Sequence, residues 1–288
     1  MWVVLALLTA LAESLKDLWA KRFLLNQADF LLIAWGLHAG STLFLVPITW
    51  SIDGFVFKST VFPVLAIVAT ANATVVVLYM FALRSGELSE VVPLLTLTPL
   101  FMLLTSPLLL GETPSWMGGV GVATIVLGAY WLHMPARREY WYQPFVLLLR
   151  KPAAQAMLLI ALIWSVTGNL DKLGVARSTP LVWGTLTNGA IAMLLFPVVL
   201  FRSRRQKEFD WKNIRKVVVV LGVLGAIVTF TQMTAITLTL VPYVIAIKRL
   251  SILFSVIWGG IVLREQQFRQ RLIAASIMVG GAIIITLS

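Results

Sequence analysis

The chain alternates long apolar stretches with short polar connections, and this pattern fills nearly its whole length of 288 residues. An α-helix needs about 20 predominantly apolar residues to cross a bilayer. We therefore predict ten membrane-spanning helices, near residues 2–22, 30–50, 61–83, 89–110, 115–133, 154–171, 181–201, 215–237, 241–263 and 268–286. The expected fold class is an all-α integral membrane protein.

The end of the first half of the chain is repeated in the second half. Residues 98–132, shifted by 153 positions without a gap, place Leu100, Phe101, Leu110, Glu112, Val126, Gly128 and Ala129 on Leu253, Phe254, Leu263, Glu265, Val279, Gly281 and Ala282. Because each copy holds five spans, an odd number, the second copy must enter the membrane in the opposite direction, as an inverted repeat around a central cavity. We expect a first repeat over 1–135, an interfacial linker over 136–152 and a second repeat over 153–288.

The composition supports a membrane protein independently of the spans. Apolar residues make up 59% of the chain and charged residues only 12%, which is too little polar surface for a soluble globular protein. The net charge of +11 does not indicate a nucleic-acid partner, because the cations lie in short loops between apolar spans. The bilayer is the expected partner.

The distribution of the cations predicts a membrane orientation. Seventeen Lys and Arg residues fall in loops after odd-numbered spans, three in loops after even-numbered spans and three inside spans. Cytoplasmic loops of membrane proteins carry an excess of Lys and Arg. We therefore expect a multi-pass protein of the cell (inner) membrane whose odd-numbered loops are cytoplasmic and whose termini both lie outside.

Cofactor chemistry has little support in the sequence. The chain has no Cys, so neither disulfides nor a reactive thiol are available. The two imidazoles, His38 and His133, lie in different spans without companion ligands, so no metal site and no other cofactor is expected. The first residues, Met1–Leu11, hold no Lys or Arg, and we expect them to begin a retained helix and not a signal peptide.

Small residues recur at matched places in the fifth span of each copy. Gly121 and Gly128 lie seven residues apart on one helix face, and Ala274 and Gly281 repeat that face in the second copy. Small residues allow membrane helices to approach closely. The fifth spans are therefore expected to pack closely against a neighbouring helix.

These features together resemble the drug/metabolite transporter superfamily, whose members are built from two EamA-type repeats. The resemblance rests on the repeated apolar run that ends at Glu112 and Glu265, on the small residues of the fifth spans and on the stretch 241–251. The resemblance covers nearly the whole chain and implies a ten-helix basket, with a cavity lined by spans one to four and six to nine, that moves small metabolites, often outward. Characterised relatives are usually drawn with cytoplasmic termini, which differs from the orientation given by the cations. Glu112 and Glu265 lie at span ends, where structural or gating contacts are expected.

Three ionisable residues lie together in the first span. Glu13, Lys16 and Asp17 follow i, i+3, i+4 spacing and should share one helix face. Ionisable groups are expensive in a membrane and mark functional sites by default. The cluster either neutralises itself against protein or forms a cavity wall that binds a charged substrate or carries a proton, the candidate coupling ion. Its net negative charge favours the second interpretation.

Lys248 and Arg249 in the ninth span could balance that charge. They are adjacent, so about 100° of rotation separates them on a helix and both cannot face one cavity. An ion pair with span one and direct contact with the substrate remain equal alternatives, and both require spans one and nine to lie close. A cavity that holds both signs of charge fits a zwitterion such as an amino acid.

Four amide side chains are secondary candidates for substrate binding. They are Asn72, Asn169, Asn188 and Gln232, in spans three, six, seven and eight. Hydrogen bonds between helices explain most such residues in membrane bundles, and that alternative stands beside ligand contact for each.

The function predicted from these observations is a secondary transporter that exports small polar metabolites by alternating access, as a monomer or homodimer. A flippase for a lipid-linked sugar or another amphipathic carrier is the alternative. An intramembrane enzyme is not expected, because Asp17 with Asp171 is the one aspartate pair that could serve proteolysis and Asp171 lies at a span end beside Lys172.

Overall fold

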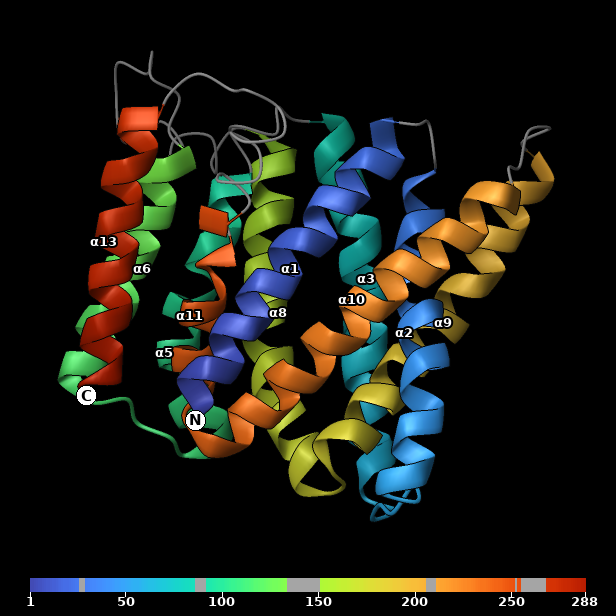
Figure 1. Ribbon diagram of the computed structural model, residues 1–288, viewed down its shortest axis with the longest axis horizontal. Helices are drawn as coiled ribbons and strands as arrows, with labels where there is room; N and C mark the ends of the chain where they lie inside the picture. The colour runs from blue at the N-terminus through green and yellow to red at the C-terminus, as the bar shows by residue number, and fades with distance from the viewer. Residues whose placement is uncertain (26–28, 86–91, 134–150, 206–210, 252, 255–267) are drawn as a thin grey trace. The chain divides into compact units, whose positions relative to one another are not determined.

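The computed structural model describes residues 1–25, 29–85, 92–133, 151–205, 211–251, 253–254 and 268–288 (Figure 1). Its elements are α1 (Trp2–Leu25), α2 (Phe30–Ile52), α3 (Val61–Ser85), the 3₁₀-helix η1 (Val92–Leu97), α5 (Thr98–Leu110), α6 (Trp116–His133), α8 (Pro152–Ala176), α9 (Pro180–Arg205), α10 (Trp211–Leu238), α11 (Val241–Lys248) and α13 (Phe268–Thr286). Every regular element in this part of the chain is a helix, and the all-α prediction is confirmed. Glu265 and nearly all of the expected linker lie outside the described residues.

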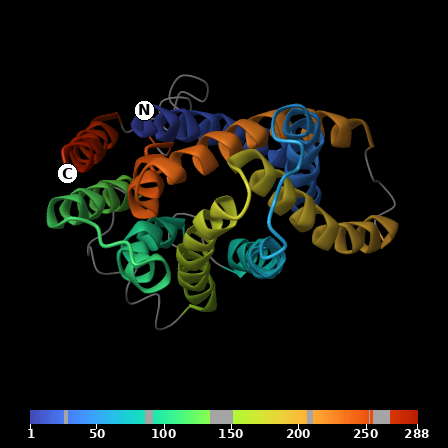
Figure 2. The ribbon, with the colours of Figure 1, turned by 90° about the horizontal axis from the view of Figure 1, so that it is seen from below.

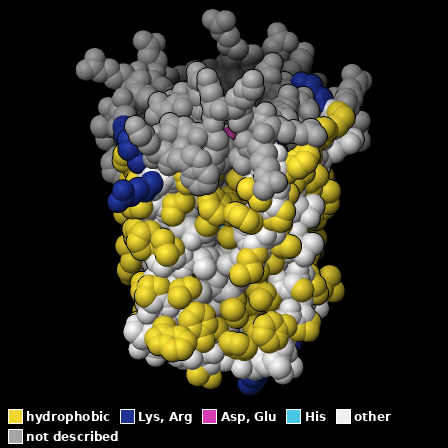
Figure 3. Space-filling model, turned by 90° about the vertical axis from the view of Figure 1, so that its right-hand side faces the viewer, with side chains coloured by type: hydrophobic (Ala, Val, Ile, Leu, Met, Phe, Trp, Pro, Cys, Tyr) yellow, Lys and Arg dark blue, Asp and Glu magenta, His cyan; other side chains and the backbone are white. Residues whose placement is uncertain are grey.

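The helices have the length and the surface of membrane spans. Helices α2, α8, α9 and α10 and the first part of α3 are long and apolar enough to cross a bilayer, and three shorter apolar helices accompany them. Large apolar side chains are exposed, among them Trp50 at 72% and Met193 at 77%. On the face drawn in Figure 3, hydrophobic side chains are spread over the described surface and Lys and Arg lie toward its ends. Lipid is the solvent that suits such a surface.

The chain forms two compact units, and each unit takes helices from both halves of the sequence. Unit 1 holds residues 1–73 and 170–238, with α1, α2, α9 and α10. Unit 2 holds residues 74–169 and 239–288, with η1, α5, α6, α11 and α13. The compact units therefore do not coincide with the sequence repeats.

In unit 1, helix α2 packs on both α9 and α10, and α1 lies along α10 (Figures 1 and 2). The α2–α10 crossing is closest at Gly40 and Gly222: a Cβ added at Gly40 would lie 2.1 Å from the Val218 carbonyl oxygen and 2.8 Å from the Gly222 Cα. Ser41 Oγ donates a hydrogen bond of 3.4 Å to the Gly222 carbonyl at the same place. Small residues thus bring the two backbones together, as in other membrane helix pairs.

In unit 2, helix α6 packs along α13, and the expected close contact of the fifth spans is confirmed. A Cβ added at Gly121 would lie 2.9 Å from the Gly281 carbonyl oxygen, and one added at Gly281 would lie 2.8 Å from the Gly121 carbonyl oxygen. The partner of the first copy's fifth span is thus the fifth span of the second copy. Gly121 also meets Ile285, and Gly281 meets Ile125, which shows that the helices run antiparallel.

Replacement of Gly281 by Ala should destabilise the protein, by roughly 1–3 kcal/mol as is usual for overpacking. Ala is the better helix former by about 1 kcal/mol, so any loss comes from the clash with Gly121 and Ile125. Gly280→Ala is the matched control, because a Cβ at Gly280 meets nothing within 4 Å. Thermal unfolding in detergent should show a lower midpoint for Gly281→Ala alone, and equal midpoints would contradict the packing.

Two of the predicted spans, the fourth and the ninth, are irregular in the structure. Span four begins as the 3₁₀-helix η1 and becomes α-helical only at Thr98. Pro99 explains this change, because a proline ring clashes with the carbonyl group four residues earlier and lacks an N–H. In span nine, α11 ends at Lys248, where the N–H groups of Arg249 and Leu250 donate to carbonyls three residues back at 3.0 and 2.9 Å. The last turn of α11 has thus tightened to 3₁₀ geometry.

Candidate functional site

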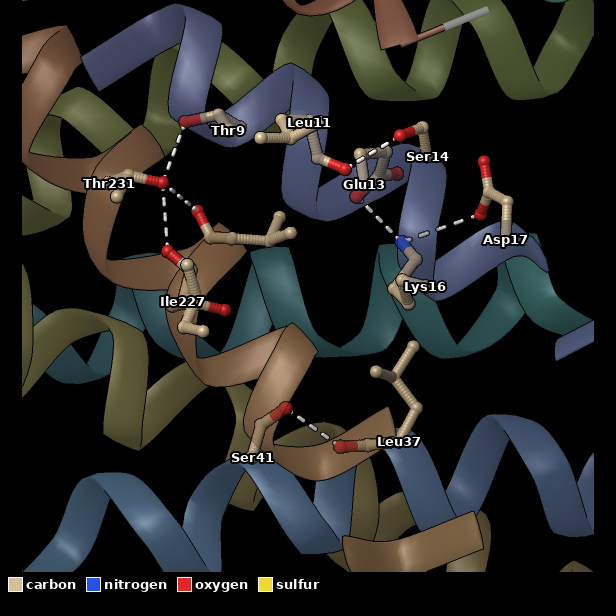
Figure 4. A network of polar contacts seen from close by, with 12 residues as sticks. Thr9, Leu11, Glu13, Ser14, Lys16, Asp17, Leu37, Ser41, Ile227 and Thr231 are labelled. Carbon is tan, nitrogen blue, oxygen red and sulfur yellow. Dashed lines mark hydrogen bonds and ion pairs between the residues drawn. The ribbon is translucent and has the colours of Figure 1, made fainter. Parts of the chain in front are cut away.

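The charged residues of span one share one face of α1, as their spacing predicts. Lys16 Nζ lies 2.7 Å from Glu13 Oε2 and 4.0 Å from Asp17 Oδ1, between the two carboxylates (Figure 4). The side chains of Glu13 and Lys16 are each 17% exposed, whereas that of Asp17 is 56% exposed. Two carboxylates around one ammonium leave the cluster with a net charge of −1, which attracts a positively charged group.

A buried hydroxyl pair fixes α1 against α10, one turn before the charged cluster. Thr9 Oγ1 and Thr231 Oγ1 lie 2.7 Å apart, and both residues are buried (Figure 4). Thr231 is also within hydrogen-bond distance of the Ile227 carbonyl oxygen in its own helix, at 2.8 Å. The charged turn of α1 is thereby held in a fixed place along α10.

A second polar layer of unit 1 joins α2, α9 and α10. His38 Nδ1 lies 2.8 Å from Asn188 Oδ1, and Asn188 Nδ2 donates to the Gly184 carbonyl oxygen at 2.8 Å and to Thr229 Oγ1 at 3.2 Å. Asn188 is 7% exposed, so its amide group is almost fully enclosed. The Lys16 ammonium lies within electrostatic range of the His38 ring, which connects this layer to the charged cluster of α1.

Helices α2 and α9 are equivalent members of the two copies. A shift of 150 positions aligns Leu31 with Leu181, Leu45 with Leu195, Pro47 with Pro197 and the N-cap Asp29 with the N-cap Thr179. The same shift aligns His38 with Asn188, so their hydrogen bond joins equivalent positions. Equivalent residues in direct contact lie on the local two-fold axis that relates α2 to α9.

The α2–α9 pair is antiparallel and is fastened at both ends. The Asp29 carboxylate accepts from Leu31 N at 2.8 Å and forms an ion pair of 3.1 Å with Arg202, near the end of α9. The Thr179 hydroxyl, which caps α9, also donates to Asp53 at the end of α2. The ion pair of Asp29 with Arg202 joins the loop after span one to the loop after span seven. The contact of Thr179 with Asp53 joins the loop after span six to the loop after span two. Odd-numbered loops thus meet odd-numbered loops and even-numbered loops meet even-numbered ones, as a chain with ten spans requires.

The other predicted amides differ in their surroundings. Asn169 is fully buried in unit 2, where Oδ1 accepts from Ser106 at 2.7 Å and Nδ2 donates to Thr105 at 2.9 Å and to the Ser165 carbonyl oxygen at 2.8 Å. These bonds use nearly all the capacity of an amide, so Asn169 joins α5 to α8. Asn72 donates to the Val68 carbonyl oxygen of its own helix at 2.9 Å, and Gln232 is partly buried in α10.

Asp171 has a structural partner in unit 1. The fully buried Trp183 donates from Nε1 to Asp171 Oδ1 at 2.9 Å, and the ring packs against Gly174, where an added Cβ would lie 2.3 Å away. A carboxylate that accepts the indole N–H aligns α8 with α9. This hydrogen bond gives Asp171 a role that does not need proteolytic chemistry.

Lys248 and Arg249 of unit 2 lie where α11 ends. Lys248 is the last residue of α11 and Arg249 is its C-cap, and both side chains are partly buried. The dipeptide Val92-Pro93 in the first copy corresponds to Val241-Pro242 in the second. Thr98 follows Val92 by six residues, whereas its equivalent Ser251 follows Val241 by ten. The four additional residues, about one helical turn, carry the charged pair into the second copy alone.

Glu112 follows Gly111, the residue that ends α5 in the left-handed conformation at φ 70°. Glu112 therefore lies in the connection between α5 and α6, at a span end as predicted. Its equivalent Glu265 lies outside the described residues.

Sequence reasoning missed His38 and Thr229, because it treated histidine only as a metal ligand. The contact partner of His38 lies 150 positions away in the chain. Alignment of the two copies around Pro47 and Pro197 contains the signal, since it places His38 and Asn188 at equivalent positions.

Comparison with known proteins agrees with this architecture. A family model described as the EamA-like transporter family matches the chain twice, over residues 1–134 and 151–287. A solved structure described only as "Crystal structure of protein" is 20% identical with a TM-score of 0.74, and the match covers 97% of this chain and 96% of that chain. At this identity the likeness shows the fold alone. No curated protein matches the chain.

Proposed function

Because the chain belongs to the EamA-like transporter family, a ten-helix membrane fold, we propose that it is a secondary transporter that exports small polar metabolites such as amino acids. The two copies, of opposite orientation, would expose the substrate site to one side of the membrane and then to the other. The repeats extend over 1–135 and 153–288, joined by an interfacial linker, and the odd-numbered loops face the cytoplasm.

The observation that carries this proposal is the charged cluster of α1. Glu13 and Lys16 are both mostly buried in a largely apolar helix, and such residues mark substrate and ion pathways in membrane proteins. The net charge of −1 suits the ammonium group of a substrate. The cationic pair Lys248 and Arg249, at the interruption of span nine, suits its carboxylate, because interrupted helices supply substrate sites in transporters.

Glu13 and Asp17 are also the groups proposed to carry a coupling proton. A carboxylate can bind either a proton or the positively charged group of a substrate. Either one neutralises its charge, so the net charge of the cluster stays the same when one replaces the other. Asn72 and Gln232 are proposed as polar contacts of the substrate, and Glu112 with Glu265 as gating contacts. Asn188, whose amide group is almost fully enclosed, is proposed to act through its hydrogen-bond partners.

Transport by proteoliposomes tests the proposal. Vesicles that contain the purified chain should take up at least one component of an isotope-labelled mixture of the standard amino acids with saturable kinetics. Glu13→Gln and Lys248→Met should each reduce that flux at least about tenfold, the effect of one lost charge-assisted hydrogen bond. Thr124→Ala is the control, because Thr124 bonds only to the Val120 carbonyl oxygen of its own helix among described contacts.

Flux that is the same in wild type, Glu13→Gln and Lys248→Met would remove the proposed site. Vesicles without saturable uptake of any component would remove amino acids as the substrate class. Thermal unfolding of each variant shows whether a lost flux reflects a lost fold.

A further inference from the structure

The hydrogen bonds of Asn188 fix which nitrogen of His38 carries a hydrogen. The Asn188 amide nitrogen faces the Gly184 carbonyl oxygen at 2.8 Å, and a carbonyl group can only accept. The atom of Asn188 that faces His38 is therefore the oxygen Oδ1. An amide oxygen accepts, so Nδ1 of His38 must donate, and in the neutral ring Nε2 is left with a lone pair.

Nε2 of His38 is an acceptor that the described part of the protein does not use. No described residue makes a hydrogen bond with it, whereas Nδ1 is engaged by Asn188. A partly buried acceptor at membrane depth lacks water as a ready partner. Lys16, which lies between the carboxylates of Glu13 and Asp17, interacts electrostatically with the His38 ring.

The position of His38 in the repeat suits a substrate contact. His38 follows the N-cap of α2 by nine positions, and Asn188 follows the N-cap of α9 by nine, about 14 Å along each helix. Both residues lie on the local two-fold axis of the α2–α9 pair. When the inward-facing and outward-facing forms exchange the roles of the two copies, a group on this axis contacts α2 and α9 in the same way in both forms. Inverted-repeat transporters bind their substrates near the membrane midplane, at the interface of the repeats.

We propose that His38 is a substrate-binding residue whose Nε2 accepts a hydrogen bond from an N–H or O–H donor of the substrate, with Asn188 and Thr229 as positioning residues. This inference rests on the proposed transport function and deepens it. Nε2 of His38 and the carboxylates of Glu13 and Asp17 are all acceptors of unit 1, so the part of the substrate that they bind is rich in donors, for an amino acid its ammonium group.

Two substitutions separate the roles of the two ring nitrogens. In His38→Asn the amide nitrogen is bonded to Cγ, as Nδ1 is, so the hydrogen bond to Asn188 is retained while the acceptor at Nε2 is lost. In His38→Gln the amide group extends one bond further and restores an acceptor near the Nε2 position. Thermal unfolding of His38→Asn is expected to stay close to that of the wild type.

Uptake from the labelled amino-acid mixture gives the functional test. His38→Asn should reduce initial uptake from a sub-saturating mixture about tenfold, and the deficit should shrink at saturating concentrations, since binding and not turnover is weakened. His38→Gln should recover part of the uptake. Wild-type uptake by His38→Asn at every concentration would overturn the inference while leaving the transport proposal intact.

The state of the ring can be measured without transport. The chain has two histidines, so His133→Gln leaves His38 as the single imidazole of a protein purified without a histidine tag. The ring ¹⁵N spectrum of His38 in this variant should show a protonated Nδ1 and an Nε2 with a lone pair. Addition of the amino-acid mixture should change the chemical shift of Nε2. A ring protonated at Nε2 and not at Nδ1 would overturn the inference even if transport fails for another reason.

Discussion

Replacement of Gly40 by Ala is expected to destabilise the protein more strongly than Gly281→Ala. The new Cβ would lie 2.1 Å from the Val218 carbonyl oxygen and 2.8 Å from the Gly222 Cα, so it meets backbone atoms and not flexible side-chain ends. Helices α2 and α10 would have to separate, at a cost of about 3 kcal/mol, the upper end of the usual range for overpacking. For a chain of this size the melting midpoint should fall by roughly 5 °C.

Gly189→Ala is the control for this prediction. Gly189 lies on α9 where that helix faces α2, and an added Cβ would meet Thr42 Cγ2 at 3.5 Å, an ordinary van der Waals contact. Because Ala favours helix over Gly, Gly189→Ala should be neutral or slightly stabilising. Equal melting midpoints for Gly40→Ala and the wild type would show that α2 and α10 are not in backbone contact.

Replacement of Lys16 by Met is expected to reduce both stability and transport. The change removes the ammonium that lies 2.7 Å from Glu13 and leaves a mostly buried carboxylate next to an apolar side chain. Removal of one partner from a buried ion pair costs about 3–5 kcal/mol, and the 17% exposure of these side chains places the expected loss near the lower limit. Flux in proteoliposomes should fall at least about tenfold through loss of the charge arrangement that binds the substrate.

The double variant Glu13→Gln with Lys16→Met separates these two effects. Removing both charges of the mostly buried pair leaves only the Asp17 carboxylate, whose side chain is 56% exposed, so the free energy of unfolding should return toward that of the wild type. Transport should stay impaired, because the charges that we propose to bind the substrate are absent. A double variant that regains both stability and full flux would show that the cluster serves only the fold.

The charged cluster and the fifth-span contact could be predicted from the sequence, because each depends on local periodicity. Glu13, Lys16 and Asp17 share a face through helix geometry alone, and Lys16 indeed lies between the two carboxylates. Gly121 and Gly281 are recognisable because repetition of small residues on one helix face needs no knowledge of the partner helix.

The polar layer at His38 could not be predicted from local pattern. Its members come from three helices, and the hydrogen bond of His38 to Asn188 depends on the antiparallel register of α2 and α9. That register is set at the helix ends, by the ion pair of Asp29 with Arg202 and the contact of Thr179 with Asp53. Residues far apart in the chain thus determine which amide meets the imidazole.

The interruption of span nine also escaped the sequence pattern. The stretch 241–263 is apolar enough to read as one continuous helix, with Lys248 and Arg249 as neighbours on it. The structure ends α11 at Lys248, so the two cations lie at a helix C-terminus. Cations are stabilised there by the helix dipole, which lowers the cost of keeping them at membrane depth.

Accessibility of single cysteines tests the central claim, the opposite orientation of the two copies, most directly. The chain has no Cys, and Ala28 and Ser178 immediately precede the equivalent N-caps Asp29 and Thr179. Ala28→Cys and Ser178→Cys, each in whole cells, are treated with a maleimide that cannot cross the membrane. We predict that Ser178→Cys reacts from outside the cell and Ala28→Cys reacts only after the membrane is opened; reaction of both from the same side would contradict the inverted repeat.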